Sequence, residues 1–487
     1  MRQKHIIAAA SVILALTTAA LPAPPETTAA SVSARIDALV QKYVEFGYFN
    51  GSILVARGAQ IIIEKGYGMA DFEWSIPNAP DTCFRLGSLT KQFTSLLIMQ
   101  LVDDGMLSLE DRLADRLPYY RSETGSKVTI HQLLNHTSGI PDYANNPNLR
   151  DRSRLPLSPR ELVTTYCSGD LEFEPGSRFA YTNSGYVILG AVIEEITGKA
   201  YEQVLRERIF NPVGMKSTGY DTSGSLVNHR AAGYENRLDG MRNADFVDMS
   251  LPYSAGALYS TVDDLYLWDQ ALYGTKLLSG AGMNKMFAPG PGSYACGWFV
   301  RKAPLGPDRA ERTVFQHTGN INGFSSLIAR IPEDHVVVVL LNNTGGVPLT
   351  LIAQGIGDIV YEREPQPPKR SIARVLHTTI REQGIDAAVA QYREIKANRA
   401  TDYDLDDEEL HQLGYSLLRN GAVDNAIAIF RLNVESFPGA WNPFDSLGEA
   451  YAVKGDKELA IKNYARSIEL NPSNVNGIKR LQALAGK

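Results

Sequence analysis

The sequence predicts an α+β domain followed by an all-α domain. Strand-like segments occur near residues 51–64 and again near 313–341, with helical patterns and many turns between them, which favours one domain whose two ends share a sheet. From residue 371 onward, apolar residues recur at helical spacing. The charged, Pro-rich segment Glu362–Arg370 separates the two parts and is typical of a linker.

The composition is that of a folded protein. The chain has 487 residues, of which 44% are hydrophobic and 21% charged, and its formal net charge is −6. These values exclude a disordered acidic chain, a collagen-like fibre and a polytopic membrane protein. They also give no electrostatic reason to expect nucleic acid as a partner. We expect four regions, namely residues 1–30, 31–361, 362–370 and 371–487.

The first 30 residues have the pattern of a cleaved secretory signal. Arg2 and Lys4 precede the apolar run Ile6–Leu16, and small residues and prolines follow it. This run is shorter than the roughly 20 residues that a spanning helix needs. We therefore expect export to the periplasm or the medium, with cleavage between Ala20 and Ser31 and no stable membrane span afterwards. An uncleaved N-terminal anchor is the alternative.

The elements of the first domain follow from local patterns. Residues 51–56 and 60–64 resemble a strand hairpin, and a helix over 89–102 ends near Gly105, a natural C-terminal cap. The region 110–310 mixes helical patterns with turns. Further strands are expected over 313–316, 325–331 and 336–341.

The C-terminal region contains an internal repeat of 34 residues. Eight small or apolar positions between Leu410 and Pro438 correspond to positions between Phe444 and Pro472. This period resembles the tetratricopeptide (TPR) helix-turn-helix repeat. Because two repeats are marginal alone, helices over 372–397 are expected to complete the stack. Such a region can bind a protein or peptide partner, or it can be a stabilising cap that binds nothing.

No cofactor and no metal site are expected. The chain has three cysteines, too few for a disulfide framework, and it contains no Cys-x-x-Cys motif and no Cys/His cluster. We interpret Cys83, Cys167 and Cys296 as small buried residues, although the sequence leaves their pairing open.

Ser88 and Lys91 form the first candidate catalytic pair. They make up the only Ser-x-x-Lys in the chain and open the predicted helix, where residues three apart share a face. A lysine that burial makes easier to deprotonate can act as the base for a serine nucleophile. The helix N-terminus supplies free N–H groups for a developing oxyanion. Taken alone, the pair is equally compatible with an ordinary helix cap and a surface lysine.

Tyr181 and Asn183 form the second element. Three Tyr-x-Asn sequences occur, beginning at Tyr143, Tyr181 and Tyr234. We favour Tyr181 because it lies between the turn-rich segment 174–178 and a helical pattern, and such a junction can present a phenol and an amide to a cleft.

His317, Thr318 and Gly319 form the third element, the only His-x-Gly in the chain. They follow the predicted strand 313–316. Glycine there would let the backbone approach a ligand closely, and the next amide, that of Asn320, can complete an oxyanion hole. The alternative is a turn histidine between two strands.

The three motifs, in this order, resemble the serine β-lactamase and penicillin-binding DD-peptidase superfamily. The likeness is greatest to its class C β-lactamase, D-aminopeptidase and esterase branch, and it covers about residues 35–360. It extends to four longer segments, Phe84–Lys91, Leu133–Asp142, Pro175–Tyr186 and Ser254–Asp263. The resemblance implies an antiparallel sheet flanked by helices with a mostly helical lobe.

The resemblance also implies the roles of the site residues. Ser88 would be the nucleophile, Lys91 and Tyr181 would share its proton, and Asn183 would orient Lys91 and bind the substrate amide. The backbone N–H groups of Ser88 and Asn320 would form the oxyanion hole. His136, Asp142 and Trp268 also lie in family-like segments, and we interpret them as supports for loops and helix packing.

One departure concerns the third motif. Many family members have Lys-Thr-Gly where this chain has His317-Thr318-Gly319. A partly charged imidazole is a weaker site for the carboxylate of a β-lactam or peptide. This substitution argues against efficient β-lactamase activity.

The sequence therefore favours an exported bacterial serine hydrolase that works through an acyl-enzyme on Ser88. The acyl donor is a small molecule or peptide, most simply a D-amino-acid-containing peptide or amide, as in DD-carboxypeptidases and D-aminopeptidases. An esterase or a weak β-lactamase is the first alternative. The alternative of another class is a non-catalytic penicillin-binding-like sensor or a TPR interaction scaffold.

Overall fold

The computed structural model describes residues 29–306 and 309–486. The predicted signal segment, residues 1–30, lies outside the described residues except for its last two, which open helix α1 (Ala29–Glu45). Within the described ranges, no helix is long and apolar enough to cross a membrane.

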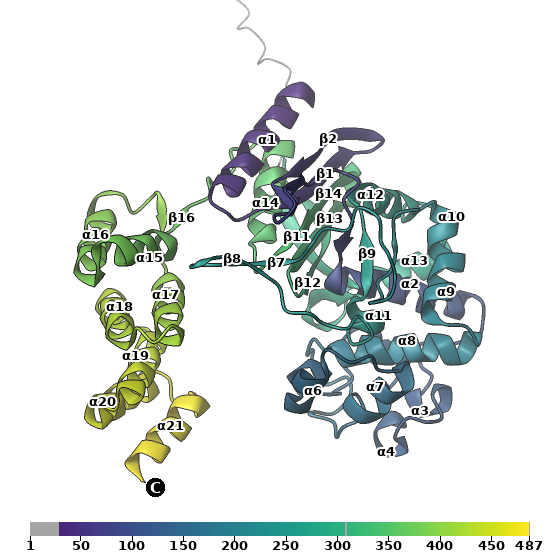
Figure 1. Ribbon diagram of the computed structural model, residues 1–487. Helices are drawn as coiled ribbons and strands as arrows, with labels where there is room; N and C mark the ends of the chain where they lie inside the picture. The colour runs from purple at the N-terminus through teal and green to yellow at the C-terminus, as the bar shows by residue number, and fades with distance from the viewer. Residues whose placement is uncertain (1–28, 307–308, 487) are drawn as a thin grey trace, which may run out of the picture.

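The first domain is built on a seven-stranded antiparallel sheet with the order β10-β11-β12-β13-β14-β1-β2 (Figure 1). The N-terminal strand β1 pairs with β14 along its whole length, from Gly51 opposite Asn342 to Arg57 opposite Val336. The predicted sharing of one sheet by the two ends of the domain is therefore confirmed. The strands are β1 (Gly51–Arg57), β2 (Gln60–Tyr67), β10 (Tyr294–Ala295), β11 (Trp298–Leu305), β12 (Ala310–Ile321), β13 (Phe324–Ile331) and β14 (Val336–Asn342).

Both faces of the sheet are covered, so its central strands are apolar on both sides. In β1, Ile53 and Val55 join a core with α1 and α14 (Leu349–Val360), whereas Leu54 and Ala56 face the larger core of the helical lobe. Alternate residues of a strand point to opposite faces, which explains why this strand is a continuous apolar run.

The helical lobe packs on the other face of the sheet from α1 and α14. Its centre is α2 (Thr90–Asp103), which is buried along almost its whole length and contacts α8 (Asn183–Thr197) and α11 (Tyr253–Gly256). The remaining helices are α3 (Leu113–Arg116), α4 (Ser122–Gly125), α5 (Ile130–Leu134), α6 (Pro147–Arg152), α7 (Pro159–Tyr166), α9 (Tyr201–Leu205), α10 (Asn211–Val213), α12 (Val262–Ala271) and α13 (Gly280–Met286).

Short strands form four small sheets around this framework, in the orders β15-β7-β8, β5-β9-β6, β3-β4 and β16-β17. Their bounds are β3 (Met69–Asp71), β4 (Ile76–Pro77), β5 (Phe84–Arg85), β6 (Gly219–Tyr220), β7 (Tyr234–Arg237), β8 (Gly240–Asn243), β9 (Leu258–Ser260), β15 (Thr344–Gly345), β16 (Arg370–Ser371) and β17 (Tyr403–Asp404).

The C-terminal region is helical, as predicted, apart from the short strand pair β16–β17. Its helices are α15 (Ile372–Gln383), α16 (Ile385–Asn398), α17 (Asp407–Arg419), α18 (Val423–Ser436), α19 (Trp441–Lys454), α20 (Lys457–Leu470) and α21 (Val475–Ala485). They form a curved stack beside the first domain (Figure 1). The pair α19–α20 begins 34 residues after the pair α17–α18. The helices therefore follow the 34-residue period, while the assignment to the TPR class stays a prediction.

Small residues at equivalent positions let the paired helices approach each other. A Cβ at Gly414 would lie 2.3 Å from the Phe430 ring, and a Cβ at Gly448 would lie 3.1 Å from the Tyr464 ring. The same glycine-on-aromatic contact thus recurs in both pairs, which accounts for the glycine and aromatic positions of the sequence repeat.

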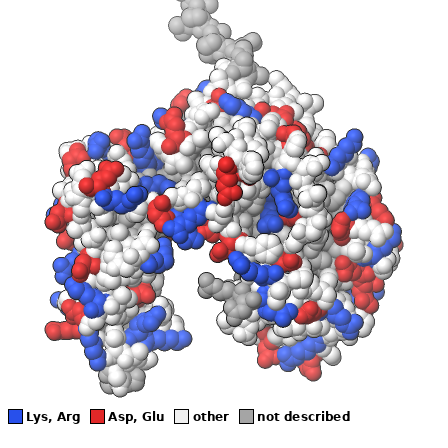
Figure 2. Space-filling model, viewed as in Figure 1, with Lys and Arg blue, Asp and Glu red and all other residues white. Residues whose placement is uncertain are grey.

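The two regions meet at the β7–β8 hairpin. The Arg374 guanidinium of α15 donates to the carbonyl oxygens of Asn236 and Arg237 at 3.0 and 3.3 Å, and Leu238 packs against the C-terminal core. A cavity of about 1270 Å³ lies at this junction. Both basic and acidic side chains line it, and an open gap separates the far ends of the two regions (Figure 2). Ser88 does not line this cavity.

Replacing Gly414 by alanine should destabilise the C-terminal helices. In an exposed helix this change would add stability through helix propensity, but here the new methyl group meets the Phe430 ring. We expect a loss of about 1–3 kcal/mol, the usual cost of overpacking, in the urea transition of the full-length protein. Gly439→Ala, at a position with open space around it, is the matched control. A stabilised Gly414→Ala protein would show that the two helices pack less tightly than described.

Candidate active site

Ser88 lies in a tight turn against which β12 packs. The strand β5 leads into the 3₁₀ turn η1 (Gly87–Leu89), and α2 continues directly from it. The predicted single helix from residue 89 is thus a short 3₁₀ turn followed by α2. Gly87 has φ +54°, and a Cβ there would lie 2.8 Å from the backbone N and O of Asn320. Glycine suits this position because of both its backbone conformation and the close approach of β12.

The Lys91 side chain is buried at the centre of the site. Its Nζ lies 2.9 Å from Ser88 Oγ, 2.8 Å from Asn183 Oδ1 and 2.9 Å from the carbonyl oxygen of Ala255. These contacts match the three donors of an ammonium group. Burial lowers the pKa of Lys91 to about 7, while the negative charge of Asp142 acts in the opposite direction. A lysine with this pKa is partly neutral near pH 7 and can accept a proton from Ser88.

Tyr181 and Asn183 approach Lys91 from the start of α8. Thr182 is the N-cap of this helix, and its side chain accepts a hydrogen bond from the Ser184 N–H. Lys91 Nζ lies 5.0 Å from the centroid of the Tyr181 ring. Burial raises the pKa of Tyr181, and a hydrogen bond with the Ser88 side chain partly offsets this effect. The Ser88 hydroxyl therefore contacts both Lys91 and Tyr181.

A chain of hydrogen bonds connects the site to Asp142. Asn183 accepts from Lys91 through Oδ1 and donates from Nδ2 to Asp142 Oδ2 at 3.0 Å. The other carboxylate oxygen of Asp142 accepts from the Ala144 N–H at 3.1 Å and caps the turn η2 (Tyr143–Asn145). Since an amide has its donor and acceptor on different atoms, Asp142 fixes which end of Asn183 faces Lys91. The sequence contained no local signal for this contact, because the two residues are 41 positions apart.

The third motif lies inside a strand. The sequence predicted a strand that ends at Gln316, but β12 continues to Ile321. Its neighbour β11 pairs with it only as far as Gln316, so among the described strands the last five residues of β12 have one unpaired edge. A Cβ at Gly319 would lie 1.9 Å from the Leu86 carbonyl oxygen and 3.0 Å from Ser88 N. Glycine therefore lets this strand lie against the turn that holds Ser88.

His317 is buried, and both its ring nitrogens have hydrogen-bond partners. Nδ1 lies 2.6 Å from the Thr318 carbonyl oxygen, and Nε2 lies 3.1 Å from the Tyr294 hydroxyl. A carbonyl can only accept, so Nδ1 carries the proton and Nε2 accepts from Tyr294. Burial and the nearby Lys91 lower the pKa of His317 to about 3. The predicted partly charged imidazole is therefore a neutral ring.

Aromatic rings form one wall of the site. Tyr181 stacks on Phe299 with ring centroids 6.3 Å apart, and Phe179 lies 6.4 Å from Phe299. The buried His136 ring lies 4.2 Å from the Tyr181 ring and accepts from the Thr182 N–H. Sequence reasoning did not find Phe179, Phe299 or Tyr294, because no motif connects them to Ser88. His136 supports Tyr181 directly.

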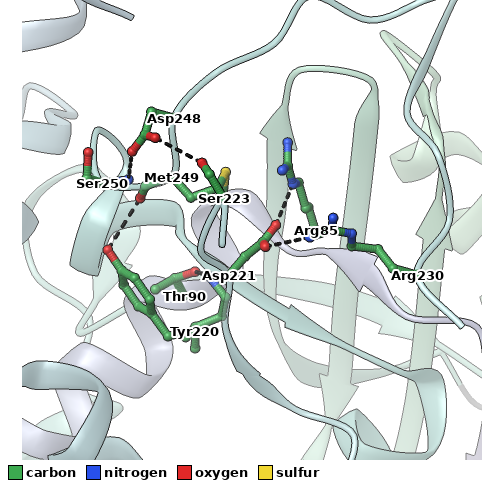
Figure 3. Close-up of polar contacts among 10 residues, drawn as sticks. Arg85, Thr90, Tyr220, Asp221, Ser223, Arg230, Asp248, Met249 and Ser250 are labelled. Atoms are coloured by element: carbon green, nitrogen blue, oxygen red, sulfur yellow. Dashed lines mark hydrogen bonds and ion pairs between the residues drawn. The ribbon is translucent and has the colours of Figure 1, made fainter. Parts of the chain in front are cut away.

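An ion-pair cluster supports the segment before Ser88. The Asp221 carboxylate is fully buried and lies 2.7 Å from both the Arg85 and the Arg230 guanidinium groups (Figure 3). Removing one partner of such a buried group typically destabilises a protein strongly. Arg85 lies three residues before Ser88, so the cluster holds β5 and the turn that follows it.

The other candidate residues lie elsewhere. The Tyr143 hydroxyl donates to the Leu251 carbonyl oxygen, and the Tyr234 hydroxyl accepts from the Phe72 N–H. Trp268 donates to Gln92 and stacks on Phe93, which fits its expected role in helix packing. The three cysteines are buried free thiols. The described part of the chain has no group of three or more histidine, cysteine, aspartate or glutamate side chains that could hold a metal ion.

Comparison with known proteins agrees with this architecture. Residues 36–356 match the Beta-lactamase protein family, and the chain belongs to that family. It is 29% identical over 307 residues to PbpX of Bacillus subtilis, a protein named for penicillin binding, covering 62% of this chain and 73% of PbpX.

Two solved structures show the same fold. The penicillin-binding protein homologue from Pyrococcus abyssi aligns with a TM-score of 0.60 at 28% identity, covering 71% of this chain and 81% of its own. The D-amino acid amidase from Ochrobactrum anthropi SV3 aligns with a TM-score of 0.58 at 26% identity, covering 68% and 96%. The family is one of serine hydrolases, and an amidase is among the similar structures.

The pH profile should report the protonation of Lys91. Below pH about 7 Lys91 is protonated, so kcat/KM for a neutral ester should fall about tenfold per pH unit. Asp142→Asn removes a charge that raises the pKa of Lys91, so the acid limb should move to lower pH by at least about half a unit. The measurement is kcat/KM between pH 5 and 9, a range chosen on both sides of the Lys91 pKa.

Asp170→Asn is the matched control for this profile, because the Asp170 carboxylate is exposed and pairs with Arg121 at the surface. An unchanged limb in the Asp142→Asn protein would show that Lys91 does not set the profile.

Proposed function

We propose that the protein is a serine hydrolase that cleaves amide or ester bonds through a covalent acyl-enzyme on Ser88. The contact between Lys91 Nζ and Ser88 Oγ, at 2.9 Å, carries this proposal. A lysine that is buried, partly neutral and aimed at a serine hydroxyl at a helix start has the properties of a general base. An ordinary surface lysine near a helix cap would be exposed and fully charged.

Acylation follows from this arrangement. Ser88 Oγ attacks the carbonyl carbon of the substrate while its proton passes to Lys91, either directly or through the Tyr181 hydroxyl, which would give its own proton to Lys91 as it accepts that of Ser88. The carbonyl oxygen becomes negative and would be bound by the backbone N–H groups of Ser88 and Asn320, which lie where β12 packs against the turn that holds Ser88. The leaving amine or alcohol then takes a proton from Tyr181, and the acyl group stays on Ser88 as an ester.

Deacylation reverses the same proton path. A water molecule loses a proton to Tyr181 or Lys91 and attacks the ester carbonyl, and Ser88 regains its proton as the acid product leaves. Asn183 keeps Lys91 directed at Ser88 through its contact with Asp142. Thr318 and Gly319, on the unpaired edge of β12, would bind the extended substrate by main-chain hydrogen bonds in the manner of an added strand.

The acyl donor we propose is a D-amino-acid-containing peptide or amide. The likeness to a D-amino acid amidase and to penicillin-binding proteins supports this class. Esters are the second candidate, supported by the likeness in fold to the hydrolase EstCE1. We also propose that residues 1–30 direct export and that the chain divides into the four regions expected from the sequence. The C-terminal helices would bind a partner.

Replacing Ser88 by alanine should abolish hydrolysis. We expect turnover of p-nitrophenyl acetate and of D-phenylalanine amide to fall by about 10⁴- to 10⁶-fold, the usual effect of losing a serine nucleophile. Intact-protein mass spectrometry after mixing with the ester, or with benzylpenicillin, should show an acyl adduct on the wild type and none on Ser88→Ala. Ser122→Ala, at an exposed serine of α4, is the control. Equal turnover by wild type and Ser88→Ala would show that Ser88 is not the nucleophile, and no turnover and no adduct with the wild type would favour the non-catalytic sensor instead.

A further inference from the structure

We propose that the C-terminal helices hold the backbone of Asn320 in place through the β7–β8 hairpin, and that Arg374 of α15 is a positioning residue for the reaction at Ser88. The inference rests on the proposed function, in which Asn320 is one of the two oxyanion donors. It assigns a catalytic effect to helices that lie beyond the region matched by the family, residues 36–356. Figure 1 shows the hairpin extending from the first domain toward α15.

The tip of the hairpin is fixed on two sides. The Arg374 guanidinium donates to the carbonyl oxygens of Asn236 and Arg237 at 3.0 and 3.3 Å, and Leu238 packs against the core of the C-terminal helices. On the side of the first domain, Asn236 donates from its side chain to the Gly47 carbonyl oxygen at 2.5 Å. Burial lowers the pKa of Arg374, so its charge is partly removed from water. Hydrogen bonds from a charged donor in such a place are stronger than those between neutral groups.

The two strands of the hairpin extend from this tip back into the first domain. β7 pairs with β8 from Arg237 opposite Gly240 to Tyr234 opposite Asn243. At its base β7 also pairs with β15, where Tyr234 lies opposite Thr344. A paired strand cannot slide without breaking its hydrogen bonds to the neighbouring strand. A displacement of the tip therefore changes the position of the base as well.

The base of the hairpin packs on the turn that follows β12. Gly323 in this turn has φ +75°, and a Cβ there would lie 2.6 Å from the backbone carbonyl carbon of Gly233, the residue before β7. The neighbouring Asn322 donates from Nδ2 to the carbonyl oxygen of Asp245, two residues after β8, at 2.9 Å. Only one residue separates Asn322 from Asn320. The hairpin thus contacts the chain immediately beyond the second oxyanion donor.

The side chain of Asn320 is connected to the same hairpin through Ser325. These two residues lie opposite each other in the pair of β12 and β13. The Ser325 hydroxyl lies 3.1 Å from Asn320 Oδ1 and 3.3 Å from the carbonyl oxygen of Thr344, the β15 residue that pairs with Tyr234. An oxyanion hole works only when its donors are held where the charge develops, and small displacements are costly. The contacts of the hairpin meet this requirement at Asn320.

The alternative is that the hairpin only attaches the C-terminal helices to the first domain. Loss of the Arg374 contact would then lower the stability of the protein and leave the reaction of the folded molecules unchanged. Arg374→Met is a suitable change because it keeps a long apolar side chain and removes the donors. Arg374→Lys keeps the charge and part of the hydrogen bonding but not the planar fork.

The first measurement is kcat/KM of the full-length protein for p-nitrophenyl acetate. We expect Arg374→Met to lower it about 5- to 20-fold, because Asn320 is displaced but not removed, and Arg374→Lys to recover part of the loss. The acid limb of the pH profile should stay where it is in the wild type, since the partners of Lys91 are untouched. Arg393→Met is the matched control, because Arg393 is an exposed arginine of α16 that pairs with Glu435 at the surface.

Phenylboronic acid separates a displaced oxyanion donor from a loss of folded protein. Its boron accepts an electron pair from Ser88 Oγ, whose proton passes to Lys91, and the resulting tetrahedral boronate resembles the acylation intermediate. Its inhibition constant should rise in Arg374→Met by about the factor by which kcat/KM falls. A variant that is only partly folded would lose activity, but its folded molecules would bind the inhibitor with the wild-type constant.

Hydrogen exchange measured by mass spectrometry tests the same contacts without any reaction. The amides of residues 320–325 and 344–345 should exchange faster in Arg374→Met and in Leu238→Ala than in the wild type, whereas those of α2 should be unchanged. Wild-type exchange at residues 320–325 in both variants would overturn the inference. Faster exchange there with unchanged kcat/KM would overturn it too, because the hairpin would then have no effect on the reaction.

The inference and the proposed function fail in different ways. If the wild type hydrolyses the ester, Ser88→Ala does not, and Arg374→Met equals the wild type, the inference is wrong and the hydrolase proposal stands. If the wild type neither hydrolyses the ester nor binds the boronic acid, the proposed function fails, and the catalytic role of Arg374 fails with it. The exchange measurement still shows in that case whether the hairpin connects the helices to Asn320.

Discussion

The burial of one lysine side chain constrains most of the structure around Ser88. An ammonium group can be buried only if each of its donors finds an acceptor. Lys91 finds them in three separate segments, namely the turn before its own helix, the start of α8 and the carbonyl oxygen of Ala255. These segments must therefore meet at one point. The same burial lowers the pKa of Lys91 to about 7, so that Lys91 can accept a proton near neutral pH.

The packing of β12 against the turn that holds Ser88 is the second constraint, and it explains two glycines. Gly87 and Gly319 lie where two backbones approach too closely for any side chain. His317 belongs to the same stretch, but its ring turns into the protein, where Tyr294 and the Thr318 carbonyl oxygen hold it neutral. The strand thus has an unpaired backbone edge and a neutral side chain at this position, which distinguishes it from a strand with lysine there.

The fold class and the order of the main elements could be predicted from the sequence. The bounds of the elements and the contacts between them could be predicted less well. The strands β1, β2, β13 and β14 are short apolar runs bounded by turns, and the sequence located each within a few residues. The strands β10 and β11 lie in the turn-rich region and were not predicted, because their residues carry no clear alternation. The contact between the β7–β8 hairpin and α15 could not be predicted from the sequence either, because Arg374 binds backbone carbonyl oxygens, which every residue type carries.

The sequence by itself determined which chemical groups the site contains and how residues that are close together in the chain are placed relative to one another. Ser88 and Lys91 adjoin because residues three apart share a helix face, and the 34-residue offset is fixed by helix lengths. Only the tertiary structure decided the charge state of the site. Whether Lys91 and His317 are charged depends on burial and on partners such as Asp142 and Tyr294, which lie far away in sequence. Burial is a property of the assembled fold, so no motif can encode it.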